Sequence, residues 1–255
     1  MMNRRLLGML GIVILFIACP REEKTTIPKF VMPKWQDGET SVYHIIRNDS
    51  VLYESRVVLR LDEEFGTPTM VVTTTVKPVQ VRHYFFDSSV VIFRRDSIRP
   101  FRSYRTVETD IGFFDIEAHY ESGKVSIRKQ SVDGVEEQTL KLPQTAYDEG
   151  MLQVLLRSVP LVPGTSFRIQ RVVPIDMRIL PVDVTVLGTK LVTTDLGKIM
   201  CREIVLVRSS EKMRFAYELK EPHRLIALYN PNGETEMLLT SYIPARSDTL
   251  EPVTP

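Results

Sequence analysis

One stretch of the sequence gathers side chains that can bind an anion. "FRRDSIRPFRSYR", residues 93–105, holds five arginines, a single acid and three aromatic side chains. Guanidinium groups bind phosphate or carboxylate with paired hydrogen bonds, and aromatic rings favour a membrane–water boundary. One hypothesis is therefore that these arginines contact an anionic lipid or glycolipid, or form the lip of a ligand cavity; they are Arg94, Arg95, Arg99, Arg102 and Arg105. The alternative is a solvated pair of strands whose arginines protect a sheet edge or pair with acids elsewhere.

The other reactive side chains form no known catalytic or metal-binding motif. Adjacent acids at residues 62–64 and 136–137 are expected at exposed strand ends, where they do not converge as a catalytic pair must. There is no G-x-S-x-G elbow, phosphate loop or H-E-x-x-H sequence. None of the histidines has a second ligand at metal-binding spacing; they are His44, His83, His119 and His223. The sequence predicts no catalytic residues, no metal and no cofactor, and the alternative is an active site assembled from distant residues.

The N-terminal segment has the parts of a secretion signal. Arg4 and Arg5 precede an apolar run of thirteen residues, Leu6–Ala18. A helix that crosses a bilayer needs about 20 apolar residues, so this run is too short to span a membrane by itself. We expect residues 1–18 to be a signal peptide that is removed from the mature protein.

The end of this signal indicates a lipid anchor. Phe16-Ile17-Ala18-Cys19 resembles the bacterial lipoprotein signal, in which the cysteine is acylated and becomes the first mature residue. Cys19 would then attach the protein to a membrane through several acyl chains, whereas in an ordinary signal peptide it would be incidental. Pro20, in place of the Asp that retains many lipoproteins at the inner membrane, favours the outer membrane. We expect a bacterial envelope protein that faces the periplasm or the cell surface.

Composition limits the partners and the redox chemistry. Lys plus Arg total 33 and Asp plus Glu total 32, which gives a formal net charge of +1. A charge this close to zero argues against nucleic acid as a partner. Apart from Cys19 the chain has one cysteine, Cys201, in the apolar run "KIMCREIVLV", so we expect a buried and inert thiol and no internal disulfide.

Most of the chain has the period of two that half-buried strands require. In "FDIEAHYE", residues 114–121, apolar and polar side chains alternate, and "PVDVTVLG" and "RFAYELK" repeat the pattern. Residues rich in Asn, Asp, Ser and Gly separate these runs and predict tight turns at 48–50, 87–89, 133–134 and 230–233. We therefore expect a meander of antiparallel strands.

One segment has a helical period instead. In "TAYDEGMLQVLLRSVPL", Thr145 and Asp148 form a helix start signal and Pro160 a stop, which predicts a helix near residues 146–159. Its apolar stripe should pack on the concave face of the sheet and cover it as a lid; the stripe consists of Met151, Leu152, Leu155, Leu156 and Val159.

These elements predict an all-β, mainly antiparallel fold: a strongly curved sheet or incomplete β-barrel with one mid-chain helix. We expect a single domain over residues 35–243, preceded by a lipidated tether at 19–34 and followed by a flexible tail at 244–255. Two smaller sheets on either side of the helix are the alternative.

Four stretches resemble the bacterial exported proteins grouped as domain of unknown function 3108. They are "WQDGETSVYHI", "YDEGMLQVLLRSVPLVPGTSFRI", "VTTDLGKIMCREI" and "YELKEPHRLIALYNPNGETEMLL". The resemblance implies an envelope location and antiparallel β architecture, and it supplies no catalytic residues because the family has none assigned.

Three classes of function follow from these features. The first is a lipid-anchored, non-enzymatic protein that binds or carries a lipid or another amphipathic small molecule in its curved sheet. The second is an assembly module that binds an envelope protein or a cell-wall polymer through its sheet edges or its arginines. The third is an envelope hydrolase, which only unplaced Asp, Glu and His residues support.

Overall fold

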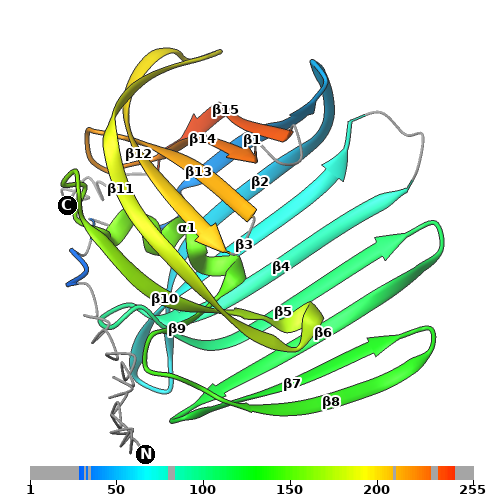
Figure 1. The fold of residues 1–255 in the computed structure, drawn as a ribbon. Coiled ribbons are helices and arrows are strands. Elements are labelled where there is room, and N and C mark those ends of the chain that lie inside the picture. Colours follow the sequence, from blue (N-terminus) through cyan, green and yellow to red (C-terminus); the bar gives the residue numbers. More distant parts are fainter. Residues whose placement is uncertain are drawn as a thin grey trace, which may run out of the picture.

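The computed structural model describes residues 29–31, 33, 36–79, 84–208, 211–230 and 235–244. Fifteen strands of this part of the chain form one sheet, in the order β8-β7-β6-β5-β4-β3-β2-β1-β15-β14-β13-β12-β11-β10-β9 (Figure 1). The predicted signal peptide, the predicted lipid anchor Cys19 and residues 245–255 lie outside the described residues.

The first half of the sheet is a meander in which each strand pairs antiparallel with the next. Its strands are β1 (Thr40–Arg47), β2 (Ser50–Glu64), β3 (Thr67–Pro78), β4 (Phe85–Arg94), β5 (Arg99–Thr109), β6 (Gly112–Glu121), β7 (Lys124–Ser131) and β8 (Gly134–Lys141).

The second half is also a meander, and it joins the first through β15 and β1. Thr40 pairs with Ile243 and Arg47 with Thr235, so β15 runs antiparallel along β1. A short strand, β9, pairs with β10 in the parallel direction and ends the sheet. The strands of this half are β9 (Ala146–Asp148), β10 (Ser166–Val173), β11 (Arg178–Thr194), β12 (Gly197–Arg208), β13 (Glu211–Glu218), β14 (Leu225–Asn230) and β15 (Thr235–Ile243).

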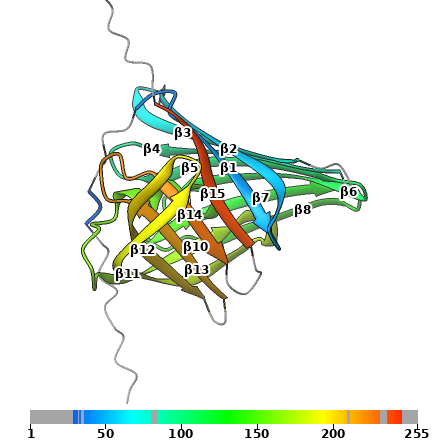
Figure 2. The same ribbon diagram turned by 90° about the horizontal axis from the view of Figure 1, so that it is seen from above.

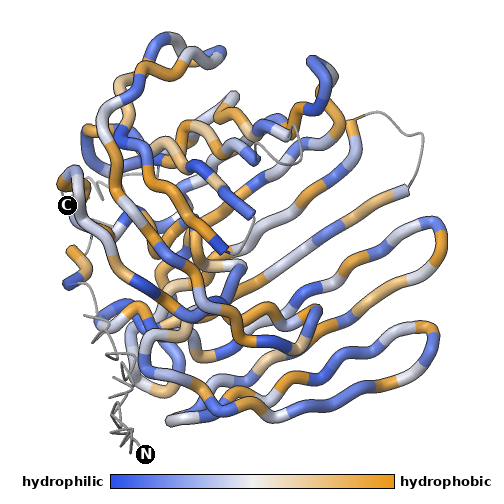
Figure 3. Tube along the Cα trace, viewed as in Figure 1, coloured by the Kyte–Doolittle hydropathy of each residue, from blue (hydrophilic) through white to orange (hydrophobic). Residues whose placement is uncertain are grey.

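Alternating hydropathy explains why these segments are strands. Figure 3 shows hydrophobic and hydrophilic residues alternating along the chain. In β11, Val182, Val184 and Val186 are buried while Asp183 is exposed, as the period of two predicts. The expected fold class is confirmed: the sheet is mainly antiparallel, strongly curved and not closed by hydrogen bonds.

The turn predicted at residues 87–89 is wrong, because Asp87, Ser88 and Ser89 lie inside β4. Their composition suggested a turn, but Asp87 and Ser89 line a cavity on the inner face of the sheet. Asp87, Ser89, Val91 and Phe93 follow the period of two, with the two polar members at the cavity and the two apolar members in the core.

Among the described residues no backbone ladder joins the two ends of the sheet, and they meet through side chains at a place that we call the seam. There, β5, β6 and β7 lie against β9, β10 and the 3-10 turn η3 (Pro174–Asp176). The contact is an apolar cluster containing Ile116, Ala118, Tyr120, Val125, Ile127, Ala146, Val172 and Met177. Seen from above, β6 to β8 extend beyond the rolled part of the sheet (Figure 2).

The helical segment is shorter than predicted. It consists of the 3-10 turn η1 (Glu149–Met151), the helix α1 (Leu152–Leu155) and the 3-10 turn η2 (Leu156–Ser158). Residues 146–148 form β9 instead of a first helical turn because they pair with β10. The N-cap is Asp148, whose side chain accepts a hydrogen bond from the Gly150 amide at 2.8 Å.

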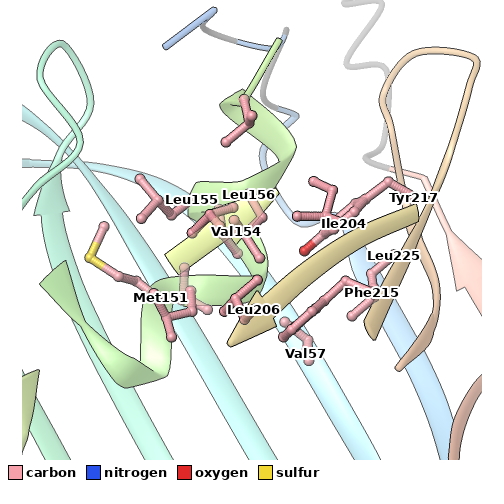
Figure 4. Close-up of a cluster of buried hydrophobic side chains, with 14 of the residues drawn as sticks. Val57, Met151, Val154, Leu155, Leu156, Ile204, Leu206, Phe215, Tyr217 and Leu225 are labelled. Atoms are coloured by element: carbon pink, nitrogen blue, oxygen red, sulfur yellow. The ribbon is translucent and has the colours of Figure 1, made fainter. Parts of the chain in front are cut away.

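This segment fills one half of the rolled sheet. The predicted stripe residues are all buried, with exposures between 0 and 5%. Figure 4 shows Met151, Val154, Leu155 and Leu156 beside side chains of β12 and β13, among them Ile204, Leu206 and Phe215. The stripe therefore packs into the core of the roll, as its period predicted.

A buried ion pair fixes the segment to two other parts of the fold. The Arg157 guanidinium donates to both carboxylate oxygens of Glu39, at 2.7 and 3.2 Å, and also to the Pro222 carbonyl oxygen. The Arg157 side chain is 6% exposed and that of Glu39 is 2% exposed. This pair ties the segment to the chain just before β1 and to the β13–β14 turn.

Candidate ligand-binding site

The other half of the roll contains a cavity of about 340 Å³. Residues of the helical segment and Pro174 of η3 form part of its lining, and inner faces of strands form the rest. Six lining residues each stand two positions from the end of their strand: Ile45, Val76, Asp87, Met213, Leu228 and Met237. Strand pairing brings these ends together, so the cavity occupies the end of the roll that the helical segment leaves unfilled.

One side of the cavity is apolar. It is built from strands in the middle of the sheet order, β1, β13, β14 and β15. Its side chains are Ile45, Met213, Phe215, Leu228 and Met237. Methionine side chains adapt to ligands of irregular shape, so this wall suits a flexible apolar group.

The opposite side is polar and lies along the seam. It carries ionisable side chains from β4, β5, β9, η1 and β10, which are Asp87, Arg105, Asp148, Glu149 and Arg171. Because the two ends of the sheet share no backbone ladder here, side-chain contacts join them. The cavity thus has an apolar wall facing a charged one.

Arg105 is the centre of this polar wall. Its Nε and Nη2 atoms donate to the two carboxylate oxygens of Asp87 at 3.0 and 2.8 Å. Its Nη1 atom donates to Glu149 Oε1 at 3.1 Å, across the seam. The three side chains are 31, 16 and 23% exposed, so solvent reaches this wall only in part.

Asp148 makes a second polar contact across the seam. The Tyr120 hydroxyl of β6 donates to Asp148 Oδ2, while the Gly150 amide donates to Oδ1. Burial raises the pKa of Asp148 above its usual range, against the opposing effect of these hydrogen bonds and of Arg105.

The carboxyl group of Glu149 has a pKa near neutral pH. Burial raises its pKa from 4.5 to about 7, with Asp148 and Asp176 acting in the same direction. Arg105 and Arg171 oppose this shift because they stabilise the carboxylate. A partly buried acid of this kind marks a candidate functional group when it also lines a cavity.

Arg171 lacks part of its hydrogen bonding. Its side chain extends from β10 to the cavity, and its Nε atom is buried with no hydrogen-bond partner among the described residues. A buried donor without an acceptor is unfavourable, so this atom could bind an acceptor group of a ligand.

The five arginines predicted as one binding surface lie in different environments. Arg105 alone lines the cavity. The guanidinium of Arg99 lies 5.2 Å from the centre of the Tyr147 ring, and that of Arg102 lies 3.7 Å from Glu64. Arg94 pairs with Arg99 in the β4–β5 ladder and is exposed, and Arg95 lies in the following turn. Contact of these other four arginines with an anionic surface stays a prediction.

Sequence reasoning missed four of the five charged residues of the polar wall. Asp148 was recognised only as part of a helix start, and Asp87 as part of a turn. Glu149 and Arg171 carry no motif and come together only through the rolling of the sheet. One sequence signal could have indicated the polar wall: a polar residue at a strand position whose neighbours two residues away face inward, as at Asp87. Of the predicted lid residues, Leu152 lines the cavity, and the others pack in the core.

Within the described ranges, no group of three or more His, Cys, Asp and Glu side chains could hold a metal ion. His119 lies beside Glu117, with 2.7 Å between Nε2 and Oε1, and His83 is outside the described residues. None of the described helices is long and apolar enough to cross a membrane.

The family assignment follows from a sequence profile. The profile of the family described as "Protein of unknown function (DUF3108)" matches residues 52–249, which is most of the chain. The chain belongs to the DUF3108 family. This confirms the resemblance noted in the sequence, and it assigns no activity. No curated protein matches the DUF3108 chain significantly.

One solved structure shares the fold of this DUF3108 protein. A β-barrel-like protein of the domain of unknown function DUF1849 from Brucella abortus superimposes with a TM-score of 0.54 at 10% identity, covering 83% of this chain and 99% of that one. A DUF1089 family protein from Pseudomonas aeruginosa gives a TM-score of 0.37 at 11% identity, over 90% and 98% of the two chains. At this identity the first similarity shows a shared fold, and the second carries no argument.

Proposed function

We propose that this protein is a non-enzymatic binding protein of the bacterial envelope that holds an amphipathic small molecule inside its rolled sheet. The observation that carries the proposal is the cavity, with an apolar wall from β1 and β13–β15 and a charged wall along the seam. Its volume of about 340 Å³ lies at the lower end of the range for small-molecule sites, about 300–1,000 Å³.

The arrangement of the two walls supports an amphipathic ligand over a wholly apolar one. An apolar chain would lie against Phe215, Leu228 and Met237, where it is removed from water. A polar head would lie near Arg105 and Arg171, whose charges are too costly to bury against hydrocarbon. The DUF1849 protein shares the rolled fold and supplies no ligand by analogy.

The proposed location is the outer membrane or the cell surface, through an acylated Cys19. The support is the sequence of the N-terminal segment, with its short apolar run that ends in Ile17-Ala18-Cys19. Acyl chains at Cys19 would keep the binding domain close to a source of amphipathic molecules. Metabolic labelling with an alkyne fatty acid should mark the wild-type protein and fail to mark Cys19→Ala.

Native mass spectrometry tests the binding function. The protein with Cys19→Ala, purified without detergent, should carry a bound small molecule or take one up from a lipid extract. A protein that emerges empty and takes up nothing would contradict the proposal.

One observation favours an assembly module as a second candidate. Among the described strands, the end strand β8 has one edge without a partner strand, and its side chains, except that of Leu140, are exposed. Such an edge can add a strand from a partner protein. Photo-crosslinking from Glu136 in intact cells should capture one envelope protein if this is the function, and should give no discrete product otherwise.

A further inference from the structure

The two arginines of the polar wall differ in how many hydrogen-bond partners they already have. Arg105 already has acidic partners on two sides, because Asp87 binds it with two hydrogen bonds and Glu149 with a third. Arg171 reaches the same cavity from β10 with its Nε atom buried and without an acceptor among the described residues. What the wall lacks, therefore, is a hydrogen-bond acceptor at Arg171.

We propose that the ligand is a single-chain amphipathic anion whose head group binds Arg171, and that Glu149 competes with this head group for the arginines. This inference rests on the proposed function and names the ligand class of the same cavity. A carboxylate or a phosphate would satisfy the guanidinium with charge-assisted hydrogen bonds. The small volume of the cavity favours one hydrocarbon chain over two.

Glu149 competes with an anionic head group because its own carboxylate already interacts with the two positively charged arginines. It binds Arg105 at 3.1 Å, and the charge of Arg171 also stabilises its ionised form. The groups that face it are Arg105 of β5, Asp148 of β9, Arg171 of β10 and Asp176 of η3, with Asp87 and Tyr120 beside them. An anion that enters this wall is repelled by the ionised form of Glu149 and not by the neutral form.

Binding should therefore be linked to proton uptake. The pKa of Glu149 is about 7 in the free protein, so its carboxyl group is mostly neutral at pH 6 and mostly ionised at pH 8. An anion bound nearby raises this pKa further. The affinity for an anion should then increase as the pH falls from 8 to 6, by up to about ten-fold.

The experiment compares ten-carbon chains that differ in the head group. Decanoate, decyl phosphate, decanol and decyltrimethylammonium are titrated against N-phenyl-1-naphthylamine bound to the full chain with Cys19→Ala. At pH 6.5 we expect one or both anions to bind about ten-fold more tightly than decanol, and the cation to bind most weakly. The stronger of the two anions distinguishes a carboxylate head group from a phosphate one.

Arg171→Gln should abolish the preference for anions over decanol. The matched control is Arg168→Gln in the same strand, because Arg168 pairs with Asp183 on the exposed face. Arg171→Lys keeps the charge and should keep part of the preference, which separates loss of charge from loss of folding. Glu149→Gln should make decanoate binding independent of pH between 6 and 8, where decanoate stays ionised.

The outcomes separate this inference from the proposed function. If all four chains displace the probe equally, or if Arg171→Gln leaves the preference unchanged, the anion assignment is wrong although the cavity binds ligands. If the cation binds most tightly, Asp87 and Glu149 define the head-group site and the inference is also wrong. If neither the probe nor any of the chains binds, the proposed function itself fails.

Discussion

Arg105 and Glu149, 44 positions apart in the chain, are joined by a 3.1 Å hydrogen bond that crosses the seam of the rolled sheet. Arg105 belongs to β5 in the first meander, whereas Glu149 begins the helical segment that follows β9. Charged side chains connect the two ends of the sheet here, and the apolar cluster of the seam connects them nearby. The same contact forms part of the charged wall of the cavity.

Glu149 should make the stability of the protein depend on pH. Its pKa is 4.5 in the unfolded chain and about 7 in the folded one, so the folded state binds more protons in this window. The free energy of unfolding should therefore fall as the pH rises from 4.5 to 7, by on the order of 3 kcal/mol from this group. Urea unfolding at a series of pH values measures this, and Glu149→Gln should flatten the dependence. The exposed Glu137→Gln control should keep the wild-type slope.

Gly150 is required because the helical segment approaches β4 closely. A Cβ atom at this position would lie 2.8 Å from Cγ2 of Val91, a buried and rigid side chain. Gly150→Ala should lower the free energy of unfolding by about 1–3 kcal/mol. In a Val91→Ala background the same change should cost much less. Gly188→Ala is the control, because its Cβ would meet no atom within 4 Å. Equal costs at the two glycines would contradict this account of the packing.

The buried pair of Arg157 and Glu39 should behave as one unit. Arg157→Met leaves a carboxylate that is 2% exposed without its partner, and should cost about 3–5 kcal/mol. The double variant Arg157→Met with Glu39→Gln should cost less than the sum of the single changes. Thermal unfolding of the four proteins of this cycle gives the coupling, and additive costs would show that the pair contributes little.

Cys201 should be unreactive in the folded protein. Its side chain is fully buried, and burial raises its pKa to about 12, so at pH 8 roughly one thiol in ten thousand is ionised. In the Cys19→Ala protein, a thiol reagent should label Cys201 only after unfolding in urea. Rapid labelling of the native protein would place this residue at the surface and contradict the predicted inert role.

The alternating strands and the apolar stripe around Leu155 were predictable because each reports a local period. The position of β9 was not, because Ala146–Asp148 lies within a helix start pattern and becomes a strand only by pairing with β10. Asp87 and Ser89 were mistaken for a turn because polar residues on an inner face are unusual unless a cavity is present. Arg105 was predicted as a binding residue, but its partners Asp87 and Glu149 come from distant segments, and their proximity depends on the rolling of the whole sheet.

The most direct test of the central claim is to fill the cavity and measure binding. Thr74 lines the cavity, whereas its neighbour Thr75 is not among the lining residues and lies on the other face of β3. Titration of N-phenyl-1-naphthylamine into Thr74→Phe should show binding weakened at least about ten-fold, while Thr75→Phe binds as the wild type does. A cooperative unfolding transition in both variants confirms that they fold. Equal binding by the two variants, or no binding by the wild type, would contradict a ligand site inside the rolled sheet.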